Sequence, residues 1–354
     1  MAGRMAIGLD IGTSGVRAAE LSVGRGGFVL ERFGQVSLPS GAVMAGEVVD
    51  QQLVADAVKK LWKEVGFSTK KVALGVANQK VVVRQVDLIW MEHAELKKAL
   101  AFQVQDYIPI PVEEAVLDFH PIEEFVNDDG GRMVRVLLVA AARDMVMSSL
   151  EMVRRAGLQA VTVDLTPFAL IRAAVNADPL GLDAQATAIV DVGARVTNIA
   201  VHQNGVPRFA RILLMGGSYL TEAVAERLGV SDDEAEVVKQ QFWTSGDAEE
   251  RNSHPVARTL DASTRSLVDE VRGSLDYYRA SAGAVPINRL VLSGGASRLG
   301  DLAQRLAVAT RLPVDIANPI AGMKVGKTGL SAEQLSYIEP LAAVSVGLAL
   351  GAAS

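Results

Sequence analysis

Apolar and polar positions alternate over the first forty residues in the manner of β-strands. Apolar runs at 5–9 and 16–21 flank a short cluster of glycine and hydroxyl residues, and 28–36 continues as a third strand. The following segment, 49–65, places its apolar residues at helical spacing and predicts a helix. The buried run 71–76 then predicts a return to the sheet. Antiparallel strands followed by a helix and a further strand are typical of an α/β domain.

The pattern changes over residues 80–142, which predict a small α+β block of their own. An Asp-Gly turn joins the last two strands as a hairpin. We expect this block to be inserted between two parts of the first domain. The small sheet either covers its edges or offers one to a partner, and a merely decorative subdomain is the alternative interpretation. The predicted elements are a strand at 81–86, a helix at 92–106, a strand at 117–122, a turn at 127–131 and a strand at 133–142.

The remaining pattern first completes the opening domain and then repeats its beginning. A helix, a strand and a helix at 144–156, 160–164 and 167–175 close the first half near Pro179. Residues 187–201 then read as an apolar strand, a short D-x-G turn and a second apolar strand, as the opening residues do. Further predictions are a strand at 206–214, helices at 219–228, 256–281, 302–310 and 341–350, a helix capped at 231–234, a polar link at 245–253, a strand at 289–293 and a loop at 316–327.

These elements predict an α/β fold made of two similar halves. The first half comprises residues 1–78 and 143–183, completed by a C-terminal helix at 337–354, and the inserted subdomain comprises 79–142. The second half comprises 184–336 and includes a smaller helical subdomain at about 225–285.

Composition excludes several classes of partner and metal site. The chain has 354 residues, of which 49% are hydrophobic, with a net charge of -6, so it can bury large cores but has no long-range attraction for nucleic acid or an anionic membrane. There are no cysteines, and the four histidines show no i, i+4 pairing, so thiolate sites are excluded and a histidine metal site is disfavoured. We expect no secretory signal, and the apolar run 341–351 is too short for a bilayer and predicts a buried helix.

The first turn has the chemistry of a phosphate-binding hairpin. Gly12 and Gly15 allow main-chain N–H groups to approach a ligand, and the hydroxyls of Thr13 and Ser14 add donors. Asp10, just before the turn, can hold a metal ion through water. The turn lies between two strands, which excludes a Walker loop. An ordinary hairpin turn explains the same residues when the motif is taken alone.

A second copy of the motif favours the phosphate interpretation. Asp191 and Gly193 stand in the repeat where Asp10 and Gly12 stand in the opening. Two such hairpins facing each other can hold a phosphate chain from both sides, with two carboxylates positioning one Mg²⁺ through its waters. The glycine turn after the strand at 289–293, at Gly294, lets a base or phosphate lie against backbone. Glu236, Lys239 and Gln240 share one helix face, which can bind a sugar hydroxyl or can simply be solvated.

The ordered set of motifs resembles the superfamily of actin, DnaK-type chaperones and sugar kinases, whose fold is the duplicated actin-like (ribonuclease H-like) one. Asp10, Gly12 and Thr13 correspond to its phosphate-1 motif, and residues 293–297 to its adenosine motif. Asp191 and Gly193, with Thr197, correspond to phosphate-2. The helices after Asp164 and Glu339 correspond to its connector helices. The inserted block and residues 105–118 resemble the PilM family of type IV pilus assembly, which is FtsA-like.

This resemblance implies an ATP-binding component of the inner-membrane pilus platform, with Mg²⁺ as cofactor. A cleft between the first domain and the inserted subdomain would take the N-terminal cytoplasmic peptide of a PilN-like membrane protein. Other platform and motor components, and self-association, are further implied partners. The protein would be cytoplasmic and would reach the inner face of the membrane through its partners, because no amphipathic tail follows the last predicted helix.

The resemblance also assigns roles to individual residues. Asp10 and Asp191 would surround the metal, and Asp164 would orient an attacking water or simply cap a helix. The role of Arg195, in the phosphate-2 turn, stays open: it either reaches a γ-phosphate or points outward. The residues assigned to the phosphates are Thr13, Ser14 and Arg17, and those assigned to the ribose, the base and the adenosine turn are Gly216, Gly217, Glu236, Lys239, Gly294, Gly295, Ala296 and Ser297.

Three functions are compatible with these motifs. A nucleotide-dependent assembly adaptor ranks first, a polymerising FtsA-like cytoskeletal ATPase second, and a small-molecule kinase third, because no acidic base is evident outside the nucleotide motifs. ATP hydrolysis is not required by the first, since phosphoryl transfer demands in-line positioning as well as metal binding.

Overall fold

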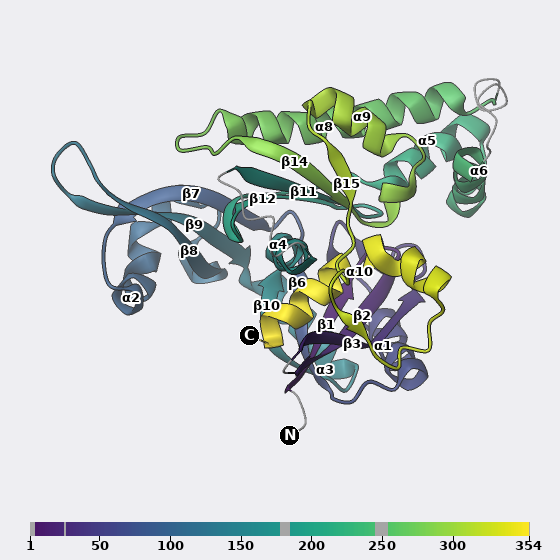
Figure 1. The fold of residues 1–354 in the computed structure, drawn as a ribbon, viewed down its shortest axis with the longest axis horizontal. Coiled ribbons are helices and arrows are strands. Elements are labelled where there is room, and N and C mark those ends of the chain that lie inside the picture. Colours follow the sequence, from purple (N-terminus) through teal and green to yellow (C-terminus); the bar gives the residue numbers. More distant parts are fainter. Residues whose placement is uncertain (1–3, 25, 178–184, 245–253, 354) are drawn as a thin grey trace.

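The computed structural model describes residues 4–24, 26–177, 185–244 and 254–353. Two β-sheets, each with its own helices, are stacked one above the other, and a smaller third sheet lies to one side (Figure 1). The predicted polar link at 245–253 and the predicted end of the first half near Pro179 lie outside the described residues.

The first half is built on a six-stranded sheet in the order β10-β6-β1-β2-β3-β16. One face packs against α1 (Gln51–Val65) and α3 (Arg143–Arg155), through residues such as Leu9, Leu61 and Met152. Helix α1 begins where the Asp50 side chain accepts hydrogen bonds from two backbone N–H groups. The strands are β1 (Arg4–Ile11), β2 (Gly15–Gly24), β3 (Gly27–Ser37), β6 (Lys71–Val76), β10 (Gln159–Leu165) and β16 (Lys324–Val325), and a two-stranded hairpin of β4 (Val43–Met44) and β5 (Glu47–Val48) precedes α1.

The second half repeats this topology. Its sheet has the order β13-β12-β11-β14-β15, in which β11 is antiparallel to β12 and parallel to β14, as β1 is to β2 and β6. This equivalence confirms the predicted duplication. Its strands are β11 (Ala186–Val192), β12 (Thr197–Gln203), β13 (Val206–Leu213), β14 (Ile287–Ser293) and β15 (Val314–Ile316), and its helices are α5 (Gly217–Leu228), α6 (Asp232–Thr244), α8 (Ala257–Arg279) and α9 (Leu302–Thr310).

Two helices lie between the sheets and join the halves. Helix α4 (Thr166–Ala177) packs against the second sheet through Ile189 and Ala200, and α10 (Ala332–Ala353) packs against β1 and β2 of the first sheet (Figure 1). Helix α10 is long and apolar enough to cross a membrane, yet its residues from Ala342 to Leu350 are buried. The predicted buried helix is confirmed, and it begins nine residues earlier than the predicted 341.

The block at 80–142 forms the third sheet, in the order β7-β9-β8, with all pairs antiparallel. Helix α2 (His93–Gln103) covers one face through Leu96 and Leu100. The strands are β7 (Val81–Ile89), β8 (Ala115–Val126) and β9 (Arg132–Ala142). The inserted α+β subdomain is therefore present as expected, whereas the exact domain boundaries stay predictions.

Three sequence-based expectations need correction. The helix predicted at 92–106 ends at Gln103, and a short 3₁₀ turn follows it. The strand predicted at 117–122 extends over Ala115–Val126, with a register shift beside Pro121. The loop predicted at 316–327 contains β16, two residues that pair with β3. A strand this short is fixed by its neighbour and leaves no periodic signal in the sequence.

Candidate functional site

The two D-x-G turns face one cleft between the halves. In the first turn the Gly12 N–H donates to the Gly15 carbonyl over 3.0 Å, and in the second the Gly193 N–H donates to the Val196 carbonyl over 2.9 Å. Both turns line a cavity of about 780 Å³. The same hydrogen bond closes both turns, so the sequence repeat is also a repeat of local geometry. Their N–H groups and hydroxyls can bind the oxygens of a phosphate chain.

A carboxylate stands at the same strand position in each half. Asp10 lies opposite Arg17 in the β1–β2 pair, and Asp191 lies opposite Asn198 in the β11–β12 pair. The Arg17 guanidinium is 3.7 Å from the Asp10 carboxylate, measured between Nη1 and Oδ2. The Asn198 amide Nδ2 donates to Asp191 Oδ2 over 3.4 Å. The duplicated fold therefore brings two carboxylates to one cleft, each with a different partner.

Burial makes both carboxylates costly to ionise. It raises the pKa of Asp10 to about 6, against the opposing effect of the Arg17 charge and with a further increase from the charge of Asp191. Burial also raises the pKa of Asp191, which the hydrogen bond from Asn198 and the charge of Arg17 only partly offset. The negative charge of the pair is thus incompletely compensated by the protein. A bound cation would supply the missing positive charge.

The donor set fits Mg²⁺ held through water. Among the described residues no group of three or more His, Cys, Asp or Glu side chains could hold a metal. Two carboxylates with remaining positions for waters and phosphate oxygens are the coordination that Mg²⁺ favours. Two polar atoms in the cleft lining, Asn198 Oδ1 and Arg17 Nε, are buried without a hydrogen-bond partner. Such atoms require a partner, and water or a ligand in this cavity can provide one.

The glycine turn at 293–297, which we call the adenosine turn after the motif that the sequence predicts there, borders the same cleft. Gly294 has φ +86°, and a Cβ there would lie 2.4 Å from the Val192 carbonyl oxygen, so only glycine fits. The Gly294 N–H and the Ser293 hydroxyl both donate to the Pro340 carbonyl, which ties this turn to α10. Beside it the Arg298 guanidinium lies 3.6 Å above the ring centre of Tyr337. A flat base can lie against this glycine turn and its aromatic border.

A family comparison covers nearly the whole chain. The model of the family described as type IV pilus assembly protein PilM matches residues 8–353. The chain belongs to this PilM family. A similar solved structure is a chain of a PilM–PilN type IV pilus biogenesis complex, with a TM-score of 0.87 and 28% identity over 99% of this chain and 98% of that chain.

More distant relatives support the FtsA-like, actin-like assignment. The cell division protein FtsA of Bacillus subtilis is 27% identical over 67% of this chain and 57% of its own length, so the match spans little more than half of that relative. FtsA of Neisseria meningitidis is 24% identical over 88% of this chain and 83% of its own length. MreB5 of Spiroplasma citri bound to ADP has a TM-score of 0.52 at 13% identity over 97% of this chain and 94% of its own, which shows the shared fold.

Most residues that the sequence motifs assigned to the site lie together. Those that line the cleft are Asp10, Gly12, Thr13, Ser14, Arg17, Asp191, Gly193, Gly217, Glu236, Lys239, Gly294, Gly295 and Ala296. The face shared by Glu236, Lys239 and Gln240 also borders it. The helix that carries them begins with the predicted cap, in which Ser231 and Glu234 exchange hydrogen bonds.

Lys239 reaches the cleft but is used for internal contacts. Its ammonium donates to the Gly217 carbonyl over 3.1 Å, to the Thr221 hydroxyl over 2.8 Å and to Glu236 over 2.6 Å. Burial tends to raise the pKa of Glu236, but the hydrogen bonds from Lys239 and Thr221 outweigh it and lower the pKa overall. Lys239 therefore joins α5 to α6 and keeps Glu236 ionised.

Four predicted site residues do not line the cleft. The Thr197 hydroxyl donates to the Met215 carbonyl over 2.7 Å, and the Ser297 hydroxyl donates to the Gly294 carbonyl over 2.7 Å. Gly216 is buried, and a Cβ there would lie 2.4 Å from the Gly193 carbonyl oxygen. These three residues support the turns from the side that faces away from the cleft.

Asp164 is the fourth. Its carboxylate forms an ion pair with Arg172 and accepts a hydrogen bond from the Leu165 N–H, so the water-orienting role predicted for it does not follow from this geometry. Thr166, two residues further along, lines the cleft instead. The sequence could not distinguish the two because both stand at the head of the same connector helix.

Sequence reasoning also missed several residues of the cleft. Asn198 lies opposite Asp191 in the second half, just as Arg17 lies opposite Asp10 in the first. A position-by-position comparison of the two repeats would therefore have indicated Asn198. The aromatic and apolar border carries no local signal, because its residues come from distant segments. These are Trp243, Leu299, Tyr337, Leu341 and Val344.

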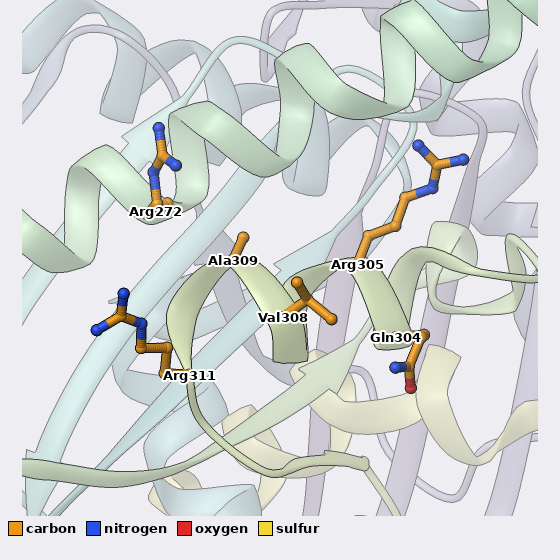
Figure 2. Close-up of a pocket in the computed structure, with 6 residues that line it drawn as sticks. All are labelled: Arg272, Gln304, Arg305, Val308, Ala309 and Arg311. Carbon is orange, nitrogen blue, oxygen red and sulfur yellow. The ribbon is translucent and has the colours of Figure 1, made fainter.

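A second, shallower pocket of about 520 Å³ lies between α8 and α9 (Figure 2). Arg272 pairs with Asp269, and Arg305 pairs with Asp261 and Asp301, so these cations are already matched by acidic neighbours. The pocket contains no glycine turn, and its lining comes from α8, α9 and Arg311, the residue that follows α9. The cleft between the D-x-G turns is the better candidate for a nucleotide.

Proposed function

We propose that this protein is a nucleotide-controlled adaptor of the type IV pilus assembly machinery. It binds ATP–Mg²⁺ between its two halves and the N-terminal cytoplasmic peptide of a PilN-like inner-membrane protein beside its inserted subdomain. The observation that carries this proposal is the similarity, over almost the full length, to a chain solved in a PilM–PilN complex. The protein would then lie at the inner face of the membrane through that partner, where other platform and motor components are further expected contacts.

The cleft supports the nucleotide part of this proposal. Thr13 and Ser14 would bind phosphate oxygens, while Asp10 and Asp191 would hold the metal through water. Bound ATP–Mg²⁺ would supply the cation that neutralises the phosphate oxygens and the two carboxylates. Arg17 would exchange part of its contact with Asp10 for a phosphate, and the Glu236 carboxylate would accept a ribose hydroxyl. ATP acts here as a controlling ligand, and no residue is assigned to proton abstraction.

The inserted subdomain contacts the second half, which provides a route for that control. Ile212 of β13 packs against a cluster that includes Val81 of β7, Ala141 of β9 and Val76 of the first sheet. Gln85 of β7 donates to the Ala282 carbonyl, in the segment that follows α8, over 3.4 Å. Closure of the halves around a nucleotide would move this contact. A shift there changes the position of the inserted subdomain and hence its affinity for the peptide.

A titration tests the proposed function. The full chain is titrated by calorimetry with synthetic N-terminal peptides of the membrane proteins encoded beside its gene, with and without ATP–Mg²⁺. We expect one peptide to bind, with an affinity that changes about fivefold or more when ATP–Mg²⁺ is present. If none of these peptides binds in either condition, the adaptor function is wrong. Filaments formed with ATP and no partner would favour the cytoskeletal function instead.

The Ile212→Ala variant tests the route of coupling. We expect the variant to bind ATP–Mg²⁺ alone and the peptide alone as the parent does. The factor by which ATP–Mg²⁺ changes peptide affinity should fall by at least half, because the contact between the second half and the inserted subdomain is weakened. Val308→Ala, at an exposed position of α9, is the matched control and should keep the full factor. An unchanged coupling factor in Ile212→Ala would show that control does not pass through this contact.

A further inference from the structure

Arg195 is held in the cleft by a contact that it can readily exchange. The described residues of the cleft lining include four cationic side chains: Arg17, Arg195, Lys239 and Arg298. Arg17 faces Asp10, Lys239 is buried among internal acceptors, and Arg298 lies on Tyr337. Arg195 forms an ion pair with Glu222 of α5, whose carboxylate also lines the cleft.

Two hydrogen bonds join the turn that carries Arg195 to the start of α5. The Gly217 N–H donates to the Gly193 carbonyl over 2.9 Å, and the Ser218 N–H donates to the Ala194 carbonyl over 2.7 Å. The first two backbone N–H groups of α5 therefore bind carbonyl oxygens of the turn. At Gly216 the helix and the turn approach so closely that a side chain would not fit between them. The turn and the helix form one unit, so only side chains can respond to a ligand at this point.

The Arg195–Glu222 pair is half open to solvent, with side-chain exposures of 36% and 42%. Exposed ion pairs contribute about 0–1 kcal/mol, because water screens the charges and both long side chains lose freedom. A terminal phosphate carries more negative charge than a carboxylate, and its oxygens can equally accept two parallel N–H bonds from the planar guanidinium. Exchange of Glu222 for a phosphate is thus favourable.

The position of the turn indicates which phosphate. The adenosine turn packs against the end of β11, where the Gly294 Cα approaches Val192. Arg195 stands three residues further along, near the tip of the turn. A phosphate chain that starts at the adenosine turn and extends between the two D-x-G turns reaches this tip last.

We propose that Arg195 contacts the terminal phosphate of ATP and that Glu222 holds it in place when that phosphate is absent. Arg195 is thereby the residue that distinguishes ATP from ADP. This inference rests on the proposed nucleotide function of the cleft and adds the means by which the cleft senses the state of the nucleotide.

Calorimetric titrations of the full chain with ATP–Mg²⁺ and with ADP–Mg²⁺ test this role. In Arg195→Gln we expect the ATP affinity to fall roughly tenfold and the ADP affinity to change less than twofold, because one charge-assisted contact is lost from ATP alone. Glu222→Gln releases Arg195 and should strengthen ATP binding without strengthening ADP binding. Arg227→Gln, an exposed change on the same helix as Glu222, is the control and should alter neither affinity.

The outcomes separate this inference from the proposed function. Equal losses for ATP and ADP in Arg195→Gln, or no loss for either, overturn the role of Arg195 while the cleft remains a nucleotide site. A parent protein that binds neither nucleotide overturns the proposed function together with this role. Arg195→Lys keeps the charge and should retain part of the preference for ATP, which distinguishes a phosphate contact from a purely structural one.

Discussion

Replacing Asp10 by asparagine should weaken ATP–Mg²⁺ binding by roughly 10- to 100-fold and at the same time raise the thermal stability of the nucleotide-free protein. The binding loss follows from removing one of two charged groups that would hold the metal, since a hydrogen bond involving a charged group contributes about 1.5–3 kcal/mol. The gain in stability follows from the cost of ionising a carboxyl group that is buried beside Asp191.

The pH dependence of this gain has a definite sign. Burial raises the pKa of Asp10 from its ordinary value of 3.8 to about 6 in the folded protein, so the folded state holds the proton more tightly. Asp10 therefore opposes folding above pH 6, and this cost disappears as the pH falls toward 4. Each pKa unit corresponds to about 1.4 kcal/mol, so Asp10→Asn should stabilise the protein by about 1–3 kcal/mol at pH 7.5 and by little at pH 4.

Thermal unfolding at several pH values measures this effect. Asp10→Asn should unfold a few degrees above the parent at pH 7.5, and the difference should shrink through pH 6 to 4. Asp128→Asn, at an exposed position of the β8–β9 hairpin, should leave the unfolding temperature unchanged throughout. A lower unfolding temperature for Asp10→Asn at pH 7.5 would mean that the Arg17 contact outweighs the burial of the carboxylate.

Replacing Gly347 by alanine should destabilise the whole fold by about 3–5 kcal/mol. Helix α10 crosses α4 at this residue, and a Cβ there would lie 1.9 Å from the Ala169 carbonyl oxygen. The clash is with backbone on a neighbouring helix, so no side-chain rotation relieves it. The two helices must separate, and they are the elements that join the two halves.

Chemical unfolding of Gly347→Ala gives the measurement, and Gly273→Ala gives the matched control. Gly273 lies inside α8, and a Cβ there meets no atom within 4 Å. Alanine should therefore stabilise the protein slightly at 273, by up to about 1 kcal/mol, because it has the higher helix propensity. A parent-like denaturation midpoint for Gly347→Ala would show that α4 and α10 are not in the close contact described.

The sequence predicted those parts of the molecule that depend on local pattern. The D-x-G turns, the helices and the inserted block could be predicted because periodicity and turn chemistry are written in neighbouring residues. Asp10 and Asp191 were recognised together because the chain repeats itself. The repeat also predicted two similar halves, and the two sheets have matching strand orders.

The parts that were missed depend on contacts between distant segments. Strand β16 forms because β3 lies beside it and pairs with it. The carboxylate of Asp164 does not line the cleft, because it pairs with Arg172, eight residues along the chain. Lys239 lines the cleft, but its contacts with the Thr221 hydroxyl and the Gly217 carbonyl could not be predicted from the sequence. The contact of Ile212 with the inserted subdomain had no sequence signal at all.

A crystal structure of the full chain with a non-hydrolysable ATP analogue and Mg²⁺ would locate the nucleotide itself. We expect the triphosphate between the turns at Gly12 and Gly193, the base beside Gly295, and the metal joined through water to Asp10 and Asp191. Nucleotide bound elsewhere, or a triphosphate whose metal has no contact with either carboxylate, would contradict this expectation.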